Sequence, residues 1–311
     1  FKNFLAYVIR IFSFNFALDI KAMDCLYPTT FKSNFVMTTS IPILFGASLA
    51  GMYAHAVARK KQRIKEAACL LRPEQKLEMR ILTDAAKAQL HLSATRCMTA
   101  FLLMSYIILP TVSFNIFSIF SCEEFDDGSL LLRVDYQVNC LGRDYLMYQV
   151  LAGLMGLIYP FGMPLTYYVL LFRKRYRLNP QKWAKKKVPK TLEEALRRRA
   201  KTRKLDSIRF LFDMYKPECW WWEVFETFRR LSLTGALMVA NDPLLQPFLG
   251  VTICLAALMM YSHHNPFITT EDNRIAAFAQ LEIYFVLVMS LLLASQETST
   301  RNSNTIAWLL I

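Results

Sequence analysis

The chain has 311 residues, of which 54% are hydrophobic and 20% charged, and its formal net charge is +13 at pH 7. Soluble domains carry about 25% charged residues. Here the charges fall in blocks between long apolar runs, which predicts an integral membrane protein. No nucleic-acid-binding motif accompanies the positive charge, so we expect no nucleic acid as a partner. Because Phe1 is not Met and lies in an apolar stretch, we expect the chain to be part of a longer protein.

Long apolar runs recur along the whole chain. A helix needs about 20 apolar residues to cross some 30 Å of hydrocarbon, and backbone groups in lipid must be hydrogen-bonded within their own segment. We therefore predict an all-α, polytopic transmembrane bundle. Its six complete spans are predicted at 34–57, 97–120, 147–172, 223–240, 244–262 and 274–295, with partial spans at 1–18 and 305–311.

The connecting segments differ in charge, which predicts how the chain is threaded. Between 173 and 209 there are sixteen Lys and Arg against three acidic residues, and 58–96 is also basic. The segment 121–146 is acidic instead. Because basic loops are retained in the cytoplasm, we predict that loops 58–96 and 173–222 are cytoplasmic and that loop 121–146 is extracellular.

Two of the seven cysteines bracket the acidic loop. A bond between Cys122 and Cys140 would close a loop of about 18 residues and contribute about 3 kcal/mol. Disulfides persist outside the cell, so we predict this bond. Cys25 also faces outward in this threading, and it competes for either partner or pairs with a cysteine upstream of the chain.

Tyr215–Leu231 is the most distinctive stretch. Trp220, Trp221 and Trp222 follow Pro217 and precede a span, which favours an aromatic belt at the level of the lipid headgroups.

Charged residues also occur inside two predicted spans. Glu226 faces Arg229 and Arg230 at positions i+3 and i+4 of one helix. Glu282 lies about 12 Å into the last complete span, where an acidic residue is expensive. We predict that Glu282 pairs with Arg229 or Arg230 across two helices. A protonated Glu282 and arginines that extend to the interface are the alternatives.

Prolines recur inside the predicted spans, and no motif for catalysis or metal binding accompanies them. The prolines are expected to kink their helices, either for packing or as part of a mechanism; they are Pro42, Pro110, Pro160 and Pro164. We expect no cofactor, no metal and no enzymatic activity, because there is no phosphate-binding glycine loop and no nucleophile–base pair.

Several segments, in chain order, are similar to one membrane-protein family. They include Asp24-Cys-Leu, Ile108-Leu-Pro-Thr-Val-Ser, Ile158-Tyr-Pro-Phe-Gly-Met-Pro-Leu, Tyr215-Lys-Pro-Glu-Cys-Trp-Trp-Trp-Glu, Arg229-Arg-Leu-Ser-Leu-Thr-Gly and Asn265-Pro-Phe. They resemble the TRP-like, or polycystin-like, membrane region of protist and algal cell-surface proteins. In those proteins this region often follows cysteine-rich, EGF-like or ephrin-receptor-like repeats.

The resemblance implies a receptor-like or channel-like role at the cell surface. We expect a channel-like or sensory multi-pass protein, including a cation-conducting one, in the plasma membrane or another membrane of the secretory pathway. A non-conducting anchor or assembly subunit is the first alternative, and a transporter is the second. Expected partners are the bilayer, with anionic lipids at the basic loops, and proteins or the chain's own ectodomain on the outer face. An oligomer is compatible with the sequence.

Overall fold

The computed structural model describes residues 31–70, 76–125, 127–183, 189, 191–239, 242 and 244–301. Within these ranges most residues are helical, and three short strands form one small sheet. The fold is therefore mostly α-helical, as predicted. The predicted partial spans at 1–18 and 305–311 and the residue Cys25 lie outside the described residues.

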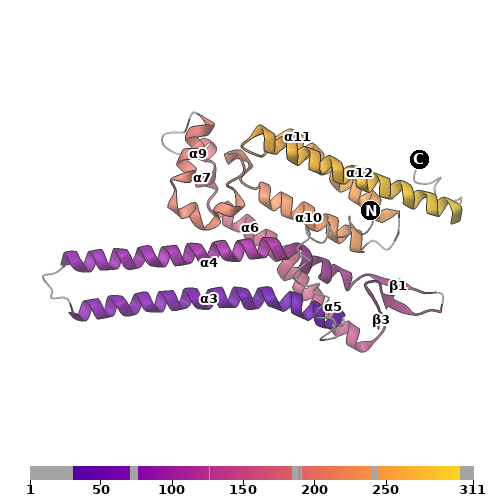
Figure 1. The fold of residues 1–311 in the computed structure, drawn as a ribbon, viewed down its shortest axis with the longest axis horizontal. Helices are drawn as coiled ribbons and strands as arrows, with labels where there is room; N and C mark the ends of the chain where they lie inside the picture. The colour runs from indigo at the N-terminus through magenta and orange to yellow at the C-terminus, as the bar shows by residue number, and fades with distance from the viewer. Residues whose placement is uncertain are drawn as a thin grey trace.

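Two long antiparallel helices form one edge of the molecule (Figure 1). They are α3 (Phe31–Leu70) and α4 (Lys76–Ser118). Each contains a predicted span and continues into the basic segment 58–96, so most of that segment is helical rather than an irregular loop. Its many Ala, Lys, Arg, Gln and Leu residues are good helix formers, which accounts for the extension. Pro42 and Pro110 lie within these unbroken helices.

A small antiparallel sheet follows the C-terminal end of α4 (Figure 1). Its strands β1 (Cys122–Glu124), β2 (Leu130–Leu132) and β3 (Asp135–Asn139) pair in that order. The β1–β2 turn contains Gly128 with φ of 78°, a conformation that favours glycine.

The next apolar run changes helix type at a proline. It consists of α5 (Arg143–Gly156), the π-helix η2 (Leu157–Phe161) and α6 (Gly162–Arg173). Pro160 lies in η2 and has no N–H to donate, which fits the wider helical turn there. Pro164 is in the first turn of α6, where proline is tolerated.

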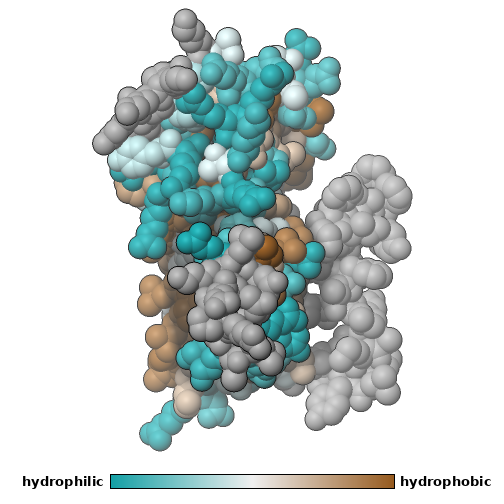
Figure 2. Space-filling view, turned by 90° about the vertical axis from the view of Figure 1, so that its left-hand side faces the viewer, coloured by the Kyte–Doolittle hydropathy of each residue, from teal (hydrophilic) through white to brown (hydrophobic). Residues whose placement is uncertain are grey.

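Short helices gather at one end of the bundle between α6 and α10. They are α7 (Arg175–Leu178), α8 (Pro180–Trp183), α9 (Leu192–Ala200) and the 3₁₀ helices η3 (Arg203–Leu211) and η4 (Pro217–Cys219). Buried Leu178, Leu205 and Ile208 pack beneath them. Figure 2 shows that hydrophilic side chains cover most of the described surface over this upper part of the molecule. We call these elements, 174–221, the basic layer.

The C-terminal part of the described chain is a three-helix group. It consists of α10 (Trp222–Val239), α11 (Leu245–His264) and α12 (Thr270–Arg301), which run side by side (Figure 1).

Five segments of the described chain are long and apolar enough to cross a membrane. They are Phe31–Glu66, Arg80–Ser118, Arg143–Arg173, Leu245–His264 and Thr270–Gln296. The helix α10, which matches the span predicted at 223–240, is not among them. It carries four charged residues within 223–230, and these lower its hydropathy.

Candidate functional site

The helix α10 contacts α4, α6 and α11, so its side chains lie at the centre of the described bundle. Trp222 at its start is fully buried and packs edge-on against Tyr261 of α11, with ring centroids 5.0 Å apart. Trp220 and Trp221 are half-buried. Aromatic residues of α10 and α11 enclose Trp222, and the belt at the level of the lipid headgroups stays a prediction.

A buried ionic cluster lies one turn further along α10. Both carboxylate oxygens of Glu226 accept hydrogen bonds from Arg229, from Nε at 3.1 Å and from an Nη at 2.5 Å. Arg230 Nε donates to the same carboxylate at 3.1 Å. Glu226 and Arg229 are only 5% and 7% exposed. The expectation that Glu226 faces both arginines on one helix is therefore confirmed, and the three side chains form ion pairs.

The predicted pairing of Glu282 with these arginines is wrong. Glu282 is exposed on α12, beside apolar residues such as Phe278 and Phe285. The arginines are satisfied by Glu226 on their own helix, three and four residues away, and need no second carboxylate. The position of Glu282 along its predicted span did not identify its partner, because this position does not determine which way the side chain faces.

Two tyrosines connect the cluster to neighbouring helices. The hydroxyl of Tyr261 on α11 donates to Glu226 at 2.8 Å. On α4, the hydroxyl of Tyr106 accepts a hydrogen bond from Arg230, whose guanidinium lies 5.0 Å from the tyrosine ring centroid. Glu226 therefore has four donors, enough for its lone pairs. The cluster joins α4, α10 and α11.

A second carboxylate continues the cluster toward the basic layer. Glu223 is 6% exposed and lies one turn before Glu226. It accepts a 2.7 Å hydrogen bond from the hydroxyl of Tyr215. Burial, reinforced by the charge of Glu223, raises the pKa of Tyr215, so this hydroxyl stays protonated and acts as a donor.

The backbone around Tyr215 is fixed by the turn between α11 and α12. Lys216 N–H donates to the Pro266 carbonyl at 2.8 Å, and Ile268 N–H donates to the Met214 carbonyl at 3.2 Å. This turn starts at Asn265, whose positive φ of 42° ends α11. The position of Tyr215 therefore depends on the α11–α12 connection as well as on α10.

Arg199 of α9 forms the outermost part of the network. It is 3% exposed and donates to the carbonyls of Tyr215 at 2.9 Å and Asp213 at 3.4 Å, while its guanidinium lies 4.9 Å from the Phe212 ring centroid. Burial lowers the pKa of Arg199 to about 10, which leaves it charged at neutral pH. A basic residue of α9 is thereby tied to the segment that leads into α10.

These contacts form two hydrogen-bonded groups that α10 joins, because Glu223 and Glu226 lie one helical turn apart. We call them together the α10 network: Arg199, Tyr215 and Glu223 in the first group, and Tyr106, Glu226, Arg229, Arg230 and Tyr261 in the second. Its α10 members are two acidic and two basic side chains, so their formal charges cancel. A balanced and hydrogen-bonded set is the form in which buried charges are tolerated.

Sequence analysis missed the tyrosines, Glu223 and Arg199. Glu223 has a signal, since it precedes Glu226 by three residues and shares its helix face. Tyr106 lies 124 residues before its partner Arg230, and Tyr261 lies 35 residues after Glu226, so nothing local marks these two tyrosines. Arg199 is one of many basic residues in the predicted loop 173–222. The sequence does not indicate that this arginine is buried while its neighbours are exposed.

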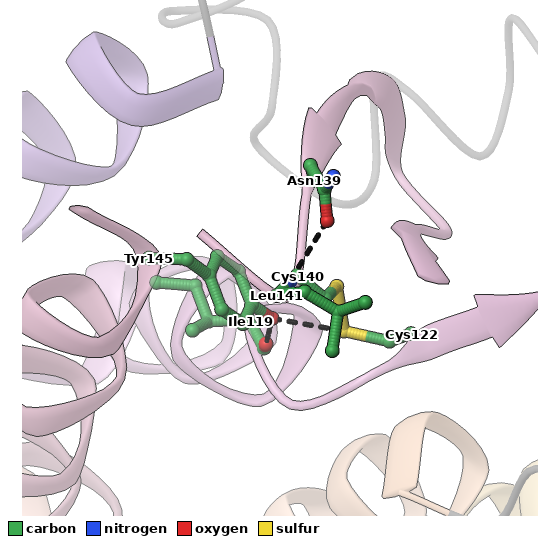
Figure 3. Close-up of a disulfide and its surroundings, with 6 residues drawn as sticks. All are labelled: Ile119, Cys122, Asn139, Cys140, Leu141 and Tyr145. Atoms are coloured by element: carbon green, nitrogen blue, oxygen red, sulfur yellow. Dashed lines mark hydrogen bonds between the residues drawn. A yellow bond between two sulfur atoms is a disulfide. The ribbon is translucent and has the colours of Figure 1, made fainter. Parts of the chain in front are cut away.

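The predicted disulfide is confirmed. Cys122 and Cys140 are bonded, with Cα atoms 6.6 Å apart, and the bond joins β1 to the residue after β3. Figure 3 shows Tyr145 beside the bond, with its hydroxyl reaching the carbonyl of Ile119 at the end of α4 and the sulfur of Cys122. The disulfide is therefore anchored to both α4 and α5.

No family model, curated protein or solved structure matches this chain.

Proposed function

We propose that the protein is a sensory or channel-like membrane subunit in which the α10 network couples the basic layer to the helical bundle. The observation that carries the proposal is a series of buried contacts along α10: Arg199 and Tyr215 reach Glu223, and one helical turn further Glu226 binds Tyr261 of α11. A buried charged network is unnecessary for simple anchoring, and ionisable groups inside a membrane bundle usually serve function. The resemblance to TRP-like membrane regions agrees with this role.

The proposal includes a threading in which α10 is a sixth span and the basic layer faces the cytoplasm. The charge difference between the loops supports it. So does the position of the disulfide-closed sheet, which follows the C-terminal end of α4, whereas the basic residues of α4 lie toward its N-terminal end (Figure 1). In this threading, the exposed basic side chains of α9 face anionic headgroups, each contributing about 1 kcal/mol of attraction.

A conducting path, in the channel form of the proposal, lies between copies of the chain. The cavity of about 230 Å³ between α3, α4 and η2 is lined almost entirely by apolar side chains, including Phe45, Phe101 and Ile108. The polar groups of the α10 network bind one another closely. Hydrated ions need a polar path, so assembly of several subunits is part of the channel form.

Patch recording from cells with confirmed surface delivery tests the proposal. Currents under voltage, stretch or anionic-lipid depletion would support it, and Glu226→Gln should alter them strongly. The matched control is Glu271→Gln, which changes an exposed acid in the first turn of α12. The absence of conductance, together with no conformational response of a reporter on α9, would reject the sensory and channel forms together.

A second candidate is a non-conducting anchor or assembly subunit. The observation that favours it is the disulfide-closed sheet, which exposes apolar side chains to a partner: Phe125, Val134, Tyr136 and Leu141. Exposed aromatic residues on a rigid element suit protein binding. Retention of surface partners by the wild type, and their loss in Tyr136→Ala without any effect on current, would favour this candidate over the first.

A further inference from the structure

A groove of about 440 Å³ lies between α3 and α4, which run side by side (Figure 1). Ligand pockets commonly occupy about 300–1,000 Å³, so the groove is large enough for a small ligand. Among the described residues that line it, four are Lys or Arg and none is acidic. Its polar lining consists of His55, Arg59, Lys60 and Arg63 of α3 and Gln89, Ser93 and Arg96 of α4. We call it the cationic groove.

The sequence accounts for the shape of the cationic groove. Arg59 and Arg63 are four residues apart on α3 and therefore lie on one helix face. Ala56 and Ala86 also line the groove, and their small side chains leave space between the two helices. Across this space, Arg63 Nη1 donates a 3.0 Å hydrogen bond to Gln89 Oε1. The two walls are thus connected at the end of the groove nearer the α3–α4 turn.

The cations of the groove have no acidic partner within the part of the chain that the structure describes. The ion pairs found there involve other residues and include none of Arg59, Lys60, Arg63 and Arg96. In the basic layer, by contrast, three arginines pair with acidic residues of their own helices. Like charges that lie close together repel one another. The groove therefore favours a ligand with several negative charges.

The cationic groove lies where the apolar parts of both helices end. Arg59 is the first charged residue of α3 after Lys32, and Arg96 is the last charged residue of α4. A transmembrane helix reaches the headgroup level near the end of its uncharged run. Met52 lines the groove on the apolar side of Arg59 and is 63% exposed. In the proposed threading, the groove opens among the inner headgroups and has an apolar edge toward the acyl chains.

From this combination we propose that the cationic groove binds a phosphoinositide, an anionic lipid whose headgroup carries additional phosphomonoesters. Each phosphomonoester has about −1.5 to −2 charges at pH 7, so two of them balance four cations. The planar forks of Arg59, Arg63 and Arg96 match phosphate oxygens, and the Ser93 hydroxyl is a further donor. Basic pockets between transmembrane helices on the cytoplasmic side bind such headgroups. A singly charged headgroup would leave most of the positive charge uncompensated.

The chain's own acidic segment does not fit this groove. Glu123 and Glu124 lie in β1, which follows the C-terminal end of α4, whereas the groove lies toward the N-terminal end of that helix. In the proposed threading, the two places are on opposite sides of the membrane, in this chain and in any second copy. The ligand must therefore come from the inner leaflet or from the cytosol. The exposed apolar side chain of Met52 favours the leaflet.

Lipid binding to the full chain tests the proposal. Native mass spectrometry of the chain released from detergent micelles counts the molecules bound during titration with phosphatidylinositol bisphosphate, phosphatidylserine or soluble inositol trisphosphate. One bisphosphate lipid should bind per chain, at least tenfold more tightly than either of the other two. Arg59→Gln and Arg96→Gln should each weaken this binding about fivefold, the effect expected for one basic residue near an anionic surface. The matched control is Lys61→Gln, which removes an exposed charge of α3 outside the groove.

Equal binding of the two lipids, or equal losses in Lys61→Gln and the two arginine variants, would overturn the proposal. Equally tight binding of inositol trisphosphate would also overturn it, since the groove would then serve a soluble phosphate. The unfolding temperature without added lipid checks folding and should be unchanged, because Arg59 and Arg96 are exposed. Arg96→Lys keeps the charge but not the planar fork, so its affinity should lie between those of the wild type and Arg96→Gln.

The proposal rests on the threading that is part of the proposed function, but not on sensory or channel activity. The two can therefore fail separately. Currents in a protein that does not bind phosphatidylinositol bisphosphate would reject the lipid site alone. Specific binding that depends on Arg59 and Arg96, in a protein with neither conductance nor a response on α9, would reject the sensory and channel forms alone.

Discussion

The carboxylate of Glu226 and the hydroxyl of Tyr261 lie 2.8 Å apart, and this hydrogen bond joins α10 to α11 at a buried position. The same carboxylate binds Arg229 and Arg230, and Arg230 contacts Tyr106 of α4. One acidic side chain thus determines how three helices meet. Arg229 and Arg230 differ in burial, so their contributions to the free energy of unfolding should differ too.

Arg229→Ala should destabilise the protein by about 3–5 kcal/mol, because it removes one member of a buried ion pair and leaves Glu226 with fewer donors. Arg230→Ala should cost less, since the Arg230 side chain is 39% exposed against 7% for Arg229. Unfolding in lipid nanodiscs measures both. Equal losses for the two variants would contradict the ranking.

Tyr261→Phe should cost about 1–3 kcal/mol, because it removes the hydroxyl that donates to a buried carboxylate and changes little else. The matched control is Tyr284→Phe on α12, since Tyr284 makes no hydrogen bond among the described residues. The control should be nearly neutral in the same unfolding measurement. If both variants behaved alike, the 2.8 Å contact would not be a significant source of stability.

Most of the helical fold could be predicted from the sequence, because lipid-crossing helices leave a strong local signal of about 20 apolar residues. The helix ends were less predictable. α3 extends to Leu70 and α4 starts at Lys76, since basic residues with good helix propensity continue both helices beyond their apolar parts. The small sheet leaves little local signal in the sequence, because its strands are three to five residues long.

The candidate site was predictable only where its contacts are local. Glu226 and the two arginines share one helix face, so their spacing was enough. The contacts with Tyr261 and Tyr106 depend on how helices pack, which one sequence does not reveal. For Glu282, by contrast, the sequence predicted a contact that does not form. Its depth suggested a partner, but the direction of its side chain, away from α10, depends on the tertiary packing of α12.

Replacing both Cys122 and Cys140 by serine should lower the free energy of unfolding by about 3 kcal/mol, because the disulfide closes an 18-residue separation in the unfolded chain. Reduction of the wild type should have a similar effect. Cys97→Ser is the control for thiol chemistry, since Cys97 is free and half-buried. A stability unchanged by reduction, with loss of the bond verified by thiol labelling, would contradict this prediction.

Acidification should loosen the β1–β2 turn at Asp127. The Asp127 carboxylate accepts hydrogen bonds from the hydroxyl and the N–H of Ser129, at 2.6 Å and 2.9 Å, and these lower its pKa from the ordinary value of 3.8. Because the folded turn favours the ionised form, this stabilisation is fully present above the ordinary pKa. It is lost as the pH falls through the lowered one.

The amide chemical shift of Ser129 reports this titration and should change with a midpoint below 3.8. Asp127→Asn keeps an oxygen acceptor at the same position but cannot ionise, so its Ser129 shift should be independent of pH over this range. A midpoint at or above the ordinary value, or the same titration in Asp127→Asn, would mean that the two hydrogen bonds to Ser129 do not favour the carboxylate. The turn would then depend on Gly128 and strand pairing alone, because these do not change with protonation of Asp127.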